Sequence, residues 1–83
     1  MARFIDQHPT NPGSPPELVT VVKRRLLSGA ADRFGARGIS VFMGKRETYC
    51  YSEAPDADAV LKSHAAMGIT LAPEDVSEVQ VLP

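Results

Sequence analysis

The order of strand-like and helix-like segments along the chain constrains its fold more than any other feature. Alternation of apolar and polar residues predicts strands, and apolar residues at spacings of three and four predict helices. By these periodicities the chain runs strand, helix, strand, strand, helix, strand. The strands are predicted over residues 3–8, 39–43, 47–53 and 74–82, and the helices over residues 15–35 and 57–67. With 83 residues there is room for one domain, so we expect a single domain over residues 1–83.

The first helix has a start signal, an apolar stripe and a stop signal. Ser14 precedes two prolines and Glu17, and this capping-box pattern predicts that Ser14 is the N-cap. Gly35 and Gly38 predict the end of the helix, since glycine favours the left-handed conformation that terminates helices. The stripe that can pack against a sheet comprises Leu18, Val22, Leu26 and Ala30.

The second half of the chain predicts a hairpin followed by a helix. Gly44-Lys45-Arg46 forms the expected tight turn between two strand patterns. Asp56 is the expected N-cap of the second helix, and Gly68 is its stop. The apolar stripe of this helix comprises Ala57, Val60, Leu61, His64 and Ala65.

This order of elements is that of the ferredoxin-like α+β fold. In that fold a four-stranded antiparallel sheet carries both helices on one face, and the first and third strands are central neighbours. The other face is open, and a domain of this size rarely leaves a sheet face bare. We therefore expect a homodimer in which two open faces pair across a two-fold axis.

Charge and composition argue against several classes of partner. Nine basic and ten acidic residues give a net charge of −1, so nothing indicates a nucleic acid or an anionic membrane as partner. The basic run Lys23-Arg24-Arg25 fits a solvated helix face. We expect no signal peptide and no membrane span, because no apolar run has the required length. The single cysteine, Cys50, excludes an intramolecular disulfide and favours the reducing cytoplasm.

A sparse set of metal-capable side chains stands out in a sequence without the strong enzyme motifs. It has no phosphate loop, no Gly-x-Gly-x-x-Gly, no Cys-x-x-Cys and no His-Glu-x-x-His. Asp6 and His8 are two apart on a predicted strand, so both side chains leave the same face. A carboxylate beside an imidazole suits borderline divalent metals, and a polar pair at a strand end is the alternative interpretation.

Three further residues each have two interpretations. His64, on the stripe of the second helix, is either a hydrogen-bonded core residue or a ligand. Cys50 is either a small core residue or a thiolate ligand, which would favour nickel, copper or zinc over magnesium. Glu53 is either a solvated charge or a carboxylate facing a site at the strand ends. Adjacent first and third strands would bring Asp6 and His8 near Cys50, but a one-residue slip of register would reverse every side chain.

The segment Thr48-Tyr49-Cys50-Tyr51-Ser52-Glu53-Ala54-Pro55, followed by Ala59-Val60, His64 and Gly68, resembles the signature of a family of small nickel-binding proteins. The N-terminal Phe4-x-Asp6-x-His8 is similar to the first strand of that family. The resemblance implies a ferredoxin-like fold, a homodimer built as an α/β barrel, and bound Ni(II). The positions that it assigns to the metal motif are Asp6, His8, Cys50, Glu53 and His64.

Two positions depart from that pattern. Pro9 and Ile69 stand where some relatives carry histidine. Fewer nitrogen donors would then be present, so a full coordination shell would need carboxylates, water or the partner subunit.

Three hypotheses for function follow. The first is a small cytoplasmic nickel-binding protein that sequesters or senses the metal rather than catalysing a reaction. The second is a cofactor-free monooxygenase or isomerase with His64 as general base and Tyr49, Tyr51 or Asp6 orienting the substrate. A deep apolar pocket that reaches His64 would favour this second hypothesis. The third is an interaction module in which the polar residues are structural.

Overall fold

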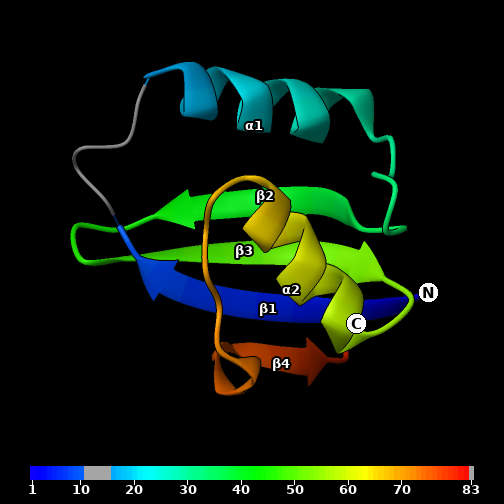
Figure 1. The fold of residues 1–83 in the computed structure, drawn as a ribbon. Helices are drawn as coiled ribbons and strands as arrows, with labels where there is room; N and C mark the ends of the chain where they lie inside the picture. Colours follow the sequence, from blue (N-terminus) through cyan, green and yellow to red (C-terminus); the bar gives the residue numbers. More distant parts are fainter. Residues whose placement is uncertain (11–15, 83) are drawn as a thin grey trace.

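The computed structural model describes residues 1–10 and 16–82, which form a four-stranded antiparallel sheet with two helices on one face (Figure 1). The strands are β1 (Ala2–Pro9), β2 (Arg37–Met43), β3 (Glu47–Ala54) and β4 (Val76–Val79). The helices are α1 (Pro16–Ser28), α2 (Ala57–Ala66) and a 3-10 turn, η1 (Pro73–Asp75). The sheet order β2-β3-β1-β4 makes β1 and β3 central neighbours, as the ferredoxin-like topology predicts.

The register of the two central strands decides which side chains meet. Asp6 lies opposite Cys50, and His8 lies opposite Thr48. Residues directly opposite in an antiparallel pair point to the same face, so Asp6, His8 and Cys50 share one face. On the other side of β3, Val41 lies opposite Cys50. The face that carries these residues is the one covered by the helices.

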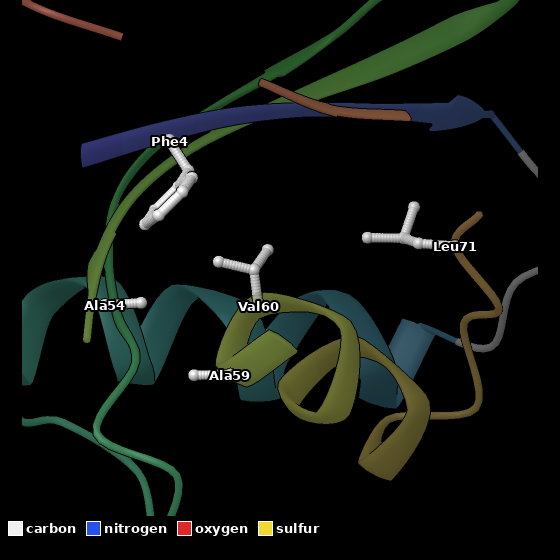
Figure 2. Close-up of a cluster of buried hydrophobic side chains, with 5 residues drawn as sticks. All are labelled: Phe4, Ala54, Ala59, Val60 and Leu71. Atoms are coloured by element: carbon white, nitrogen blue, oxygen red, sulfur yellow. The ribbon is translucent and has the colours of Figure 1, made fainter. Parts of the chain in front are cut away.

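The hydrophobic core is small and lies under α2 (Figure 2). Phe4 projects from β1 toward Val60 of α2, and both side chains are almost completely buried. The buried apolar residues are Phe4, Ala54, Ala59, Val60 and Leu71. Helix α1, by contrast, fully buries none of its residues, and its stripe residues Leu18, Val22 and Leu26 are only half-buried. Packing therefore fixes α2 more firmly than α1 on the sheet.

The first helix is shorter than the sequence predicts. It ends at Ser28, and Gly29 follows with a φ of 66° and donates its N–H to the carbonyl of Arg25 at 3.3 Å. The Ser28 hydroxyl also donates to the Arg25 carbonyl and accepts from the Ala30 N–H, which competes with further helical hydrogen bonds. Gly35, the predicted stop, lies in a later turn with a φ of 84°. The predicted N-cap, Ser14, lies outside the described residues.

The second helix begins where the sequence predicts, but it buries a different stripe. The Asp56 carboxylate accepts the Ala59 N–H at 2.8 Å, which confirms the N-cap. Ala57 and Ala65 are exposed. The buried residues are Ala59, Val60, Ser63 and His64. Only Val60 and His64 of the predicted stripe are therefore fully buried.

The last strand is also shorter than expected. Glu74 and Asp75 belong to η1 rather than to a strand over residues 74–82, and β4 spans only Val76–Val79. Pro73 has no N–H to donate to a sheet, and the Asp75 carboxylate accepts the Ala72 N–H at 3.0 Å, which stabilises the turn. No helix within residues 1–10 and 16–82 has the length and apolar character that crossing a membrane requires.

Candidate metal centre

Four of the five predicted metal residues converge at one point under α2. One donor atom from each of Asp6, His8, Cys50 and His64 lies within 4.8 Å of the other three. Strand β1 supplies the first two, β3 supplies the thiol and α2 supplies the second imidazole. The β1–β3 register and the packing of Val60 against the sheet bring these residues together.

Asp6 is the deepest of the four donors. Its side chain is 0% exposed, and neither carboxylate oxygen has a hydrogen-bond partner among the described residues. The Nε2 atom of His64 lies 3.1 Å from Oδ1, an ion-pair distance, but without the direction of a hydrogen bond. A buried carboxylate without hydrogen bonds lowers the free energy of unfolding by about 1–3 kcal/mol or more. A cation beside Asp6 would offset that cost.

The ring of His64 is held in a defined tautomer. Its Nδ1 atom lies 2.9 Å from the carbonyl oxygen of Val60, which can only accept, so Nδ1 carries a proton. In the neutral ring Nε2 then carries the lone pair and offers no proton to Asp6, whose Oδ1 lies 3.1 Å away. In metal-bound histidines one ring nitrogen typically binds the metal and the other donates its N–H to a carbonyl or carboxylate. Burial lowers the pKa of His64, but the Asp6 carboxylate and the Val60 carbonyl outweigh it, and the net shift is upward.

His8 and Cys50 complete the cluster on the side of β1 and β3. The Nδ1 atom of His8 lies 3.2 Å from the carbonyl of Pro9, and its Nε2 atom lies 3.9 Å from the sulfur of Cys50. The two imidazole rings meet edge to face, with centroids 5.8 Å apart. In both rings the Nδ1–H faces a carbonyl and Nε2 faces the cluster.

The thiol of Cys50 is protonated at neutral pH in this environment. Burial, followed by the charge of Asp6, raises the pKa of Cys50 to about 12. A bound metal cation would favour the thiolate instead, because a metal-coordinated thiol loses its proton.

The donor set fits a transition metal in its chemistry, and its dimensions are slightly larger than those of a loaded site. Two imidazoles, one carboxylate and one thiol match the preferences of borderline ions such as nickel, zinc and copper. Donors about 2.0–2.3 Å from a shared tetrahedral ion lie roughly 3.3–3.8 Å apart. The observed spread of 4.8 Å is about 1 Å larger, so the side chains must move closer together to hold an ion.

Glu53, the fifth predicted residue, lies elsewhere. It is three residues after Cys50 on β3, so its side chain leaves the opposite face of the sheet. There its carboxylate pairs with Arg37 at 3.0 Å and with Arg3 at 3.2 Å. Hydrogen bonding to Arg37, opposed by burial and helped by both arginine charges, lowers the pKa of Glu53.

A cavity of about 810 Å³ lies between α1, α2 and the sheet and opens beside the cluster. His8, Cys50 and His64 line it, whereas Asp6 does not. Its apolar walls include Leu18, Val22, Leu26, Val41, Val60, Met67 and Ile69. The pocket that the second hypothesis requires is therefore present.

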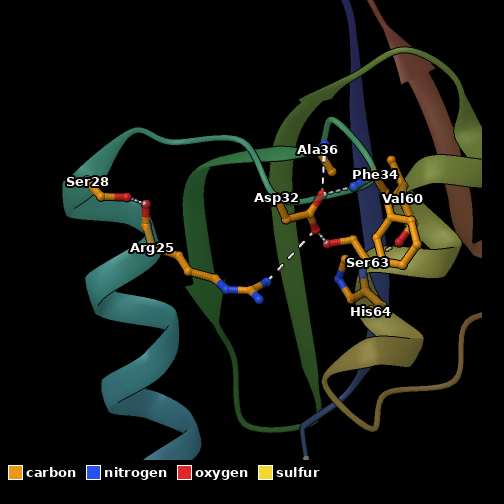
Figure 3. A network of polar contacts seen from close by, with 8 residues as sticks. All are labelled: Arg25, Ser28, Asp32, Phe34, Ala36, Val60, Ser63 and His64. Atoms are coloured by element: carbon orange, nitrogen blue, oxygen red, sulfur yellow. Dashed lines mark hydrogen bonds and ion pairs between the residues drawn. The ribbon is translucent and has the colours of Figure 1, made fainter.

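A polar network next to the cluster escaped prediction (Figure 3). One oxygen of Asp32 accepts the N–H groups of Phe34 and Ala36 at 2.9 and 3.1 Å. The other accepts the hydroxyl of Ser63 at 2.5 Å and lies 4.0 Å from the guanidinium of Arg25. The network thereby ties the segment before β2 to the residue preceding His64. The sequence contained a local signal for its first half, since Asp followed three residues later by Gly is typical of a turn.

Comparison of the chain with family models, with curated proteins and with solved structures finds no match.

Proposed function

We propose that the chain binds one divalent transition metal ion through Asp6, His8, Cys50 and His64. The observation that carries this proposal is the carboxylate of Asp6. It is completely buried, accepts no hydrogen bond from the described residues, and lies near two imidazoles and a thiol. Nickel is the proposed ion because of the resemblance in sequence, and the thiol makes magnesium a poor alternative. Sequestration or sensing of the metal in the cytoplasm is the proposed role.

Calorimetric titration with Ni(II) tests the proposal on tag-free protein. We expect about one ion per chain, and at least a tenfold loss of affinity in His8→Ala and in His64→Ala. Glu53→Gln is the matched control, because it removes a carboxylate from the opposite face of the same sheet and should retain wild-type affinity. Absence of binding by the wild type at millimolar nickel would refute the proposal.

The thiol supplies a spectroscopic test of the ligand set. Ni(II) or Co(II) bound to a thiolate gives a charge-transfer absorption in the near ultraviolet that imidazoles and carboxylates do not give. We expect this band in the loaded wild type and not in Cys50→Ser, which retains the size of the side chain. A band that persists in Cys50→Ser would remove Cys50 from the ligand set.

We further propose that the chain is a homodimer through the open face of the sheet, as dimeric α/β barrels are. Three large side chains are exposed on that face, Ile5 at 37%, Tyr49 at 41% and Phe42 at 60%. The accessible surface of 5672 Å² also exceeds the roughly 4,800 Å² expected for a compact monomer of this mass. Pairing two open faces would cover these side chains and remove part of the excess.

A cofactor-free enzyme is the second candidate, and the cavity that reaches His64 favours it. In that role Nε2 of His64, with its proton on Nδ1 held by Val60, would accept a proton from a substrate in the cavity. The dependence of catalysis on bound metal distinguishes the two candidates. Catalysis that persists after dialysis against a chelator supports the enzyme without a cofactor, whereas a requirement for metal excludes it.

A further inference from the structure

We propose that the cavity beside the metal centre binds a small molecule with an apolar body and an anionic oxygen head group, and that the head group coordinates the metal. This inference rests on the proposed metal site and names the class of ligand that the site would take. Its first support is the position of the donors. Three of the four donors line the cavity, while Asp6 lies behind them.

The position of Asp6 behind the other donors leaves the cavity side of the ion for a ligand. Metal sites that bind exogenous ligands keep a coordination position open to solvent or substrate beyond their protein donors. Four protein donors leave such a position on an ion that takes five or six ligands, as Ni(II) does. A site closed on all sides by protein would instead be expected of a structural ion. Here His8 is only partly buried, and its ring borders a cavity of about 810 Å³.

The walls of the cavity select an apolar body. Leu18, Val22 and Leu26 face it from α1, and Val41 faces it from β2. Pockets of about 300–1,000 Å³ with apolar walls and a few convergent polar groups are typical of small-molecule sites. The apolar stripe of α1 is half-exposed in the free chain because it covers this space rather than a packed core.

The charges around the cavity select an anionic head. Lys23, Arg25 and Asp32 are the charged residues of its lining apart from the histidines. Asp32 is engaged by three hydrogen bonds and faces Arg25 across the space between α1 and α2, as Figure 3 shows. Lys23 has no acidic partner within ion-pair distance among the described residues. Since the Asp6 carboxylate and the Cys50 thiolate balance the charge of Ni(II), and Arg25 balances Asp32, the lining keeps the positive charge of Lys23, which favours a negatively charged oxygen donor.

Three probes separate the two halves of such a ligand. Octanohydroxamate has a chelating oxygen head and an apolar chain, acetohydroxamate has the same head without the chain, and octanamide has the chain with a poor metal ligand. We expect nickel-loaded protein to bind octanohydroxamate at least about tenfold more tightly than either of the others. Because the two hydroxamates share one head, any extraction of nickel affects them alike and their difference reports the cavity.

A pair of tryptophan variants locates the chain of the probe. Val22→Trp fills the cavity from α1 and should abolish the tenfold preference for octanohydroxamate without changing nickel affinity. Leu27→Trp is the control, because Leu27 is 88% exposed on the same helix and does not line the cavity. It should behave as the wild type.

The outcomes distinguish this inference from the metal proposal. The inference would be overturned if the protein binds nickel but the loaded protein binds the two hydroxamates with equal affinity. It would also be overturned if the preference for octanohydroxamate survives Val22→Trp. Either result would leave the metal proposal intact. A wild-type protein that binds no nickel would overturn both. A preference that is present with nickel, absent in Val22→Trp and lost after chelation would establish both halves of the proposed ligand.

Discussion

Asp6 is the residue at which stability and metal binding make opposite demands. A buried carboxylate without hydrogen bonds lowers the stability of the metal-free fold, and the same carboxylate is the strongest hard donor of the cluster. In the neutral tautomer His64 Nε2, 3.1 Å from the carboxylate, has no proton to donate to it. Such a conflict is expected of a residue retained for binding rather than for folding.

Replacing Asp6 by Asn should separate the two demands. In a chelating buffer we expect Asp6→Asn to be at least as stable as the wild type, by about 0–2 kcal/mol, because the amide N–H can donate to His64 Nε2. In excess nickel we expect the wild type to be more stable than Asp6→Asn, because only the wild type keeps the carboxylate ligand. Denaturant unfolding under both conditions measures this. A loss above about 3 kcal/mol in the chelating buffer would show instead a structural ion pair between Asp6 and protonated His64.

Among the secondary-structure elements, the segment between α1 and β2 is held to α2 by Asp32 alone of the described carboxylates. Two hydrogen bonds, from the N–H groups of Phe34 and Ala36, hold the Asp32 side chain within its own segment, and a third, from Ser63, joins it to α2. The bond to Ser63 places the link one residue from His64, so the same contact that stabilises the fold also positions α2 over the cluster.

Asp32→Ala should destabilise the fold by about 2–3 kcal/mol, since it removes three hydrogen bonds to a charged acceptor. Asp32→Asn adds a pH signature. The hydrogen bonds from Ser63, Ala36 and Phe34, together with Arg25, outweigh the effect of burial and hold the pKa of Asp32 below its ordinary value of 3.8. The stability difference between wild type and Asp32→Asn should be constant above about pH 4–5 and should shrink as the pH falls through 3.8 and the lower folded pKa. Unfolding curves between pH 2 and 7 measure this, and a difference that grows at low pH would contradict it.

These elements also show how far the sequence determines the site. Element order is enough to place β1 beside β3, and strand periodicity is enough to put Asp6 and His8 on one face. The same periodicity separates Glu53 from Cys50, since residues three apart on a strand point to opposite faces. Glu53 entered the predicted set through its place at a strand end and through the resemblance, and its other interpretation, a charge outside the site, fits its pairing with Arg3 and Arg37. The hydrogen bond from Ser63 to Asp32 spans 31 residues and depends on how α2 rotates on the sheet, which no local pattern encodes.

For the molecule as a whole, the two faces of the sheet carry different features. The cluster of donor side chains and the cavity lie on the face covered by helices, and the exposed side chains of Tyr49 and Phe42 lie on the other. Dimerisation and metal binding should therefore be separable by mutation.

Phe42→Glu places a charge among the exposed side chains of the open face, Ile5, Tyr49 and Phe42, at the edge strand β2. We expect the wild type to scatter light as twice the 8.9 kDa mass of one chain, and Phe42→Glu to scatter as a single chain with unchanged nickel stoichiometry. Leu27→Glu is the control, since Leu27 is exposed on α1 and away from this face. A wild type that is monomeric at high micromolar concentration would exclude the dimer.

A domain this small has little stability in reserve, so metal binding should dominate its thermal unfolding. Chains of this size bury only about 60–65% of their unfolded surface, and the described core contains two alanines among five residues. Free nickel at a hundred times its dissociation constant adds about 2.7 kcal/mol to the free energy of unfolding. At about 4–8 °C per kcal/mol, that raises the melting temperature by roughly 10–20 °C.

Thermal unfolding monitored by circular dichroism, with and without nickel, measures the shift, and His64→Ala should abolish it. Calorimetric binding without any shift would mean that the ion binds surface groups that remain available in the unfolded chain, and the buried cluster would then not be the site.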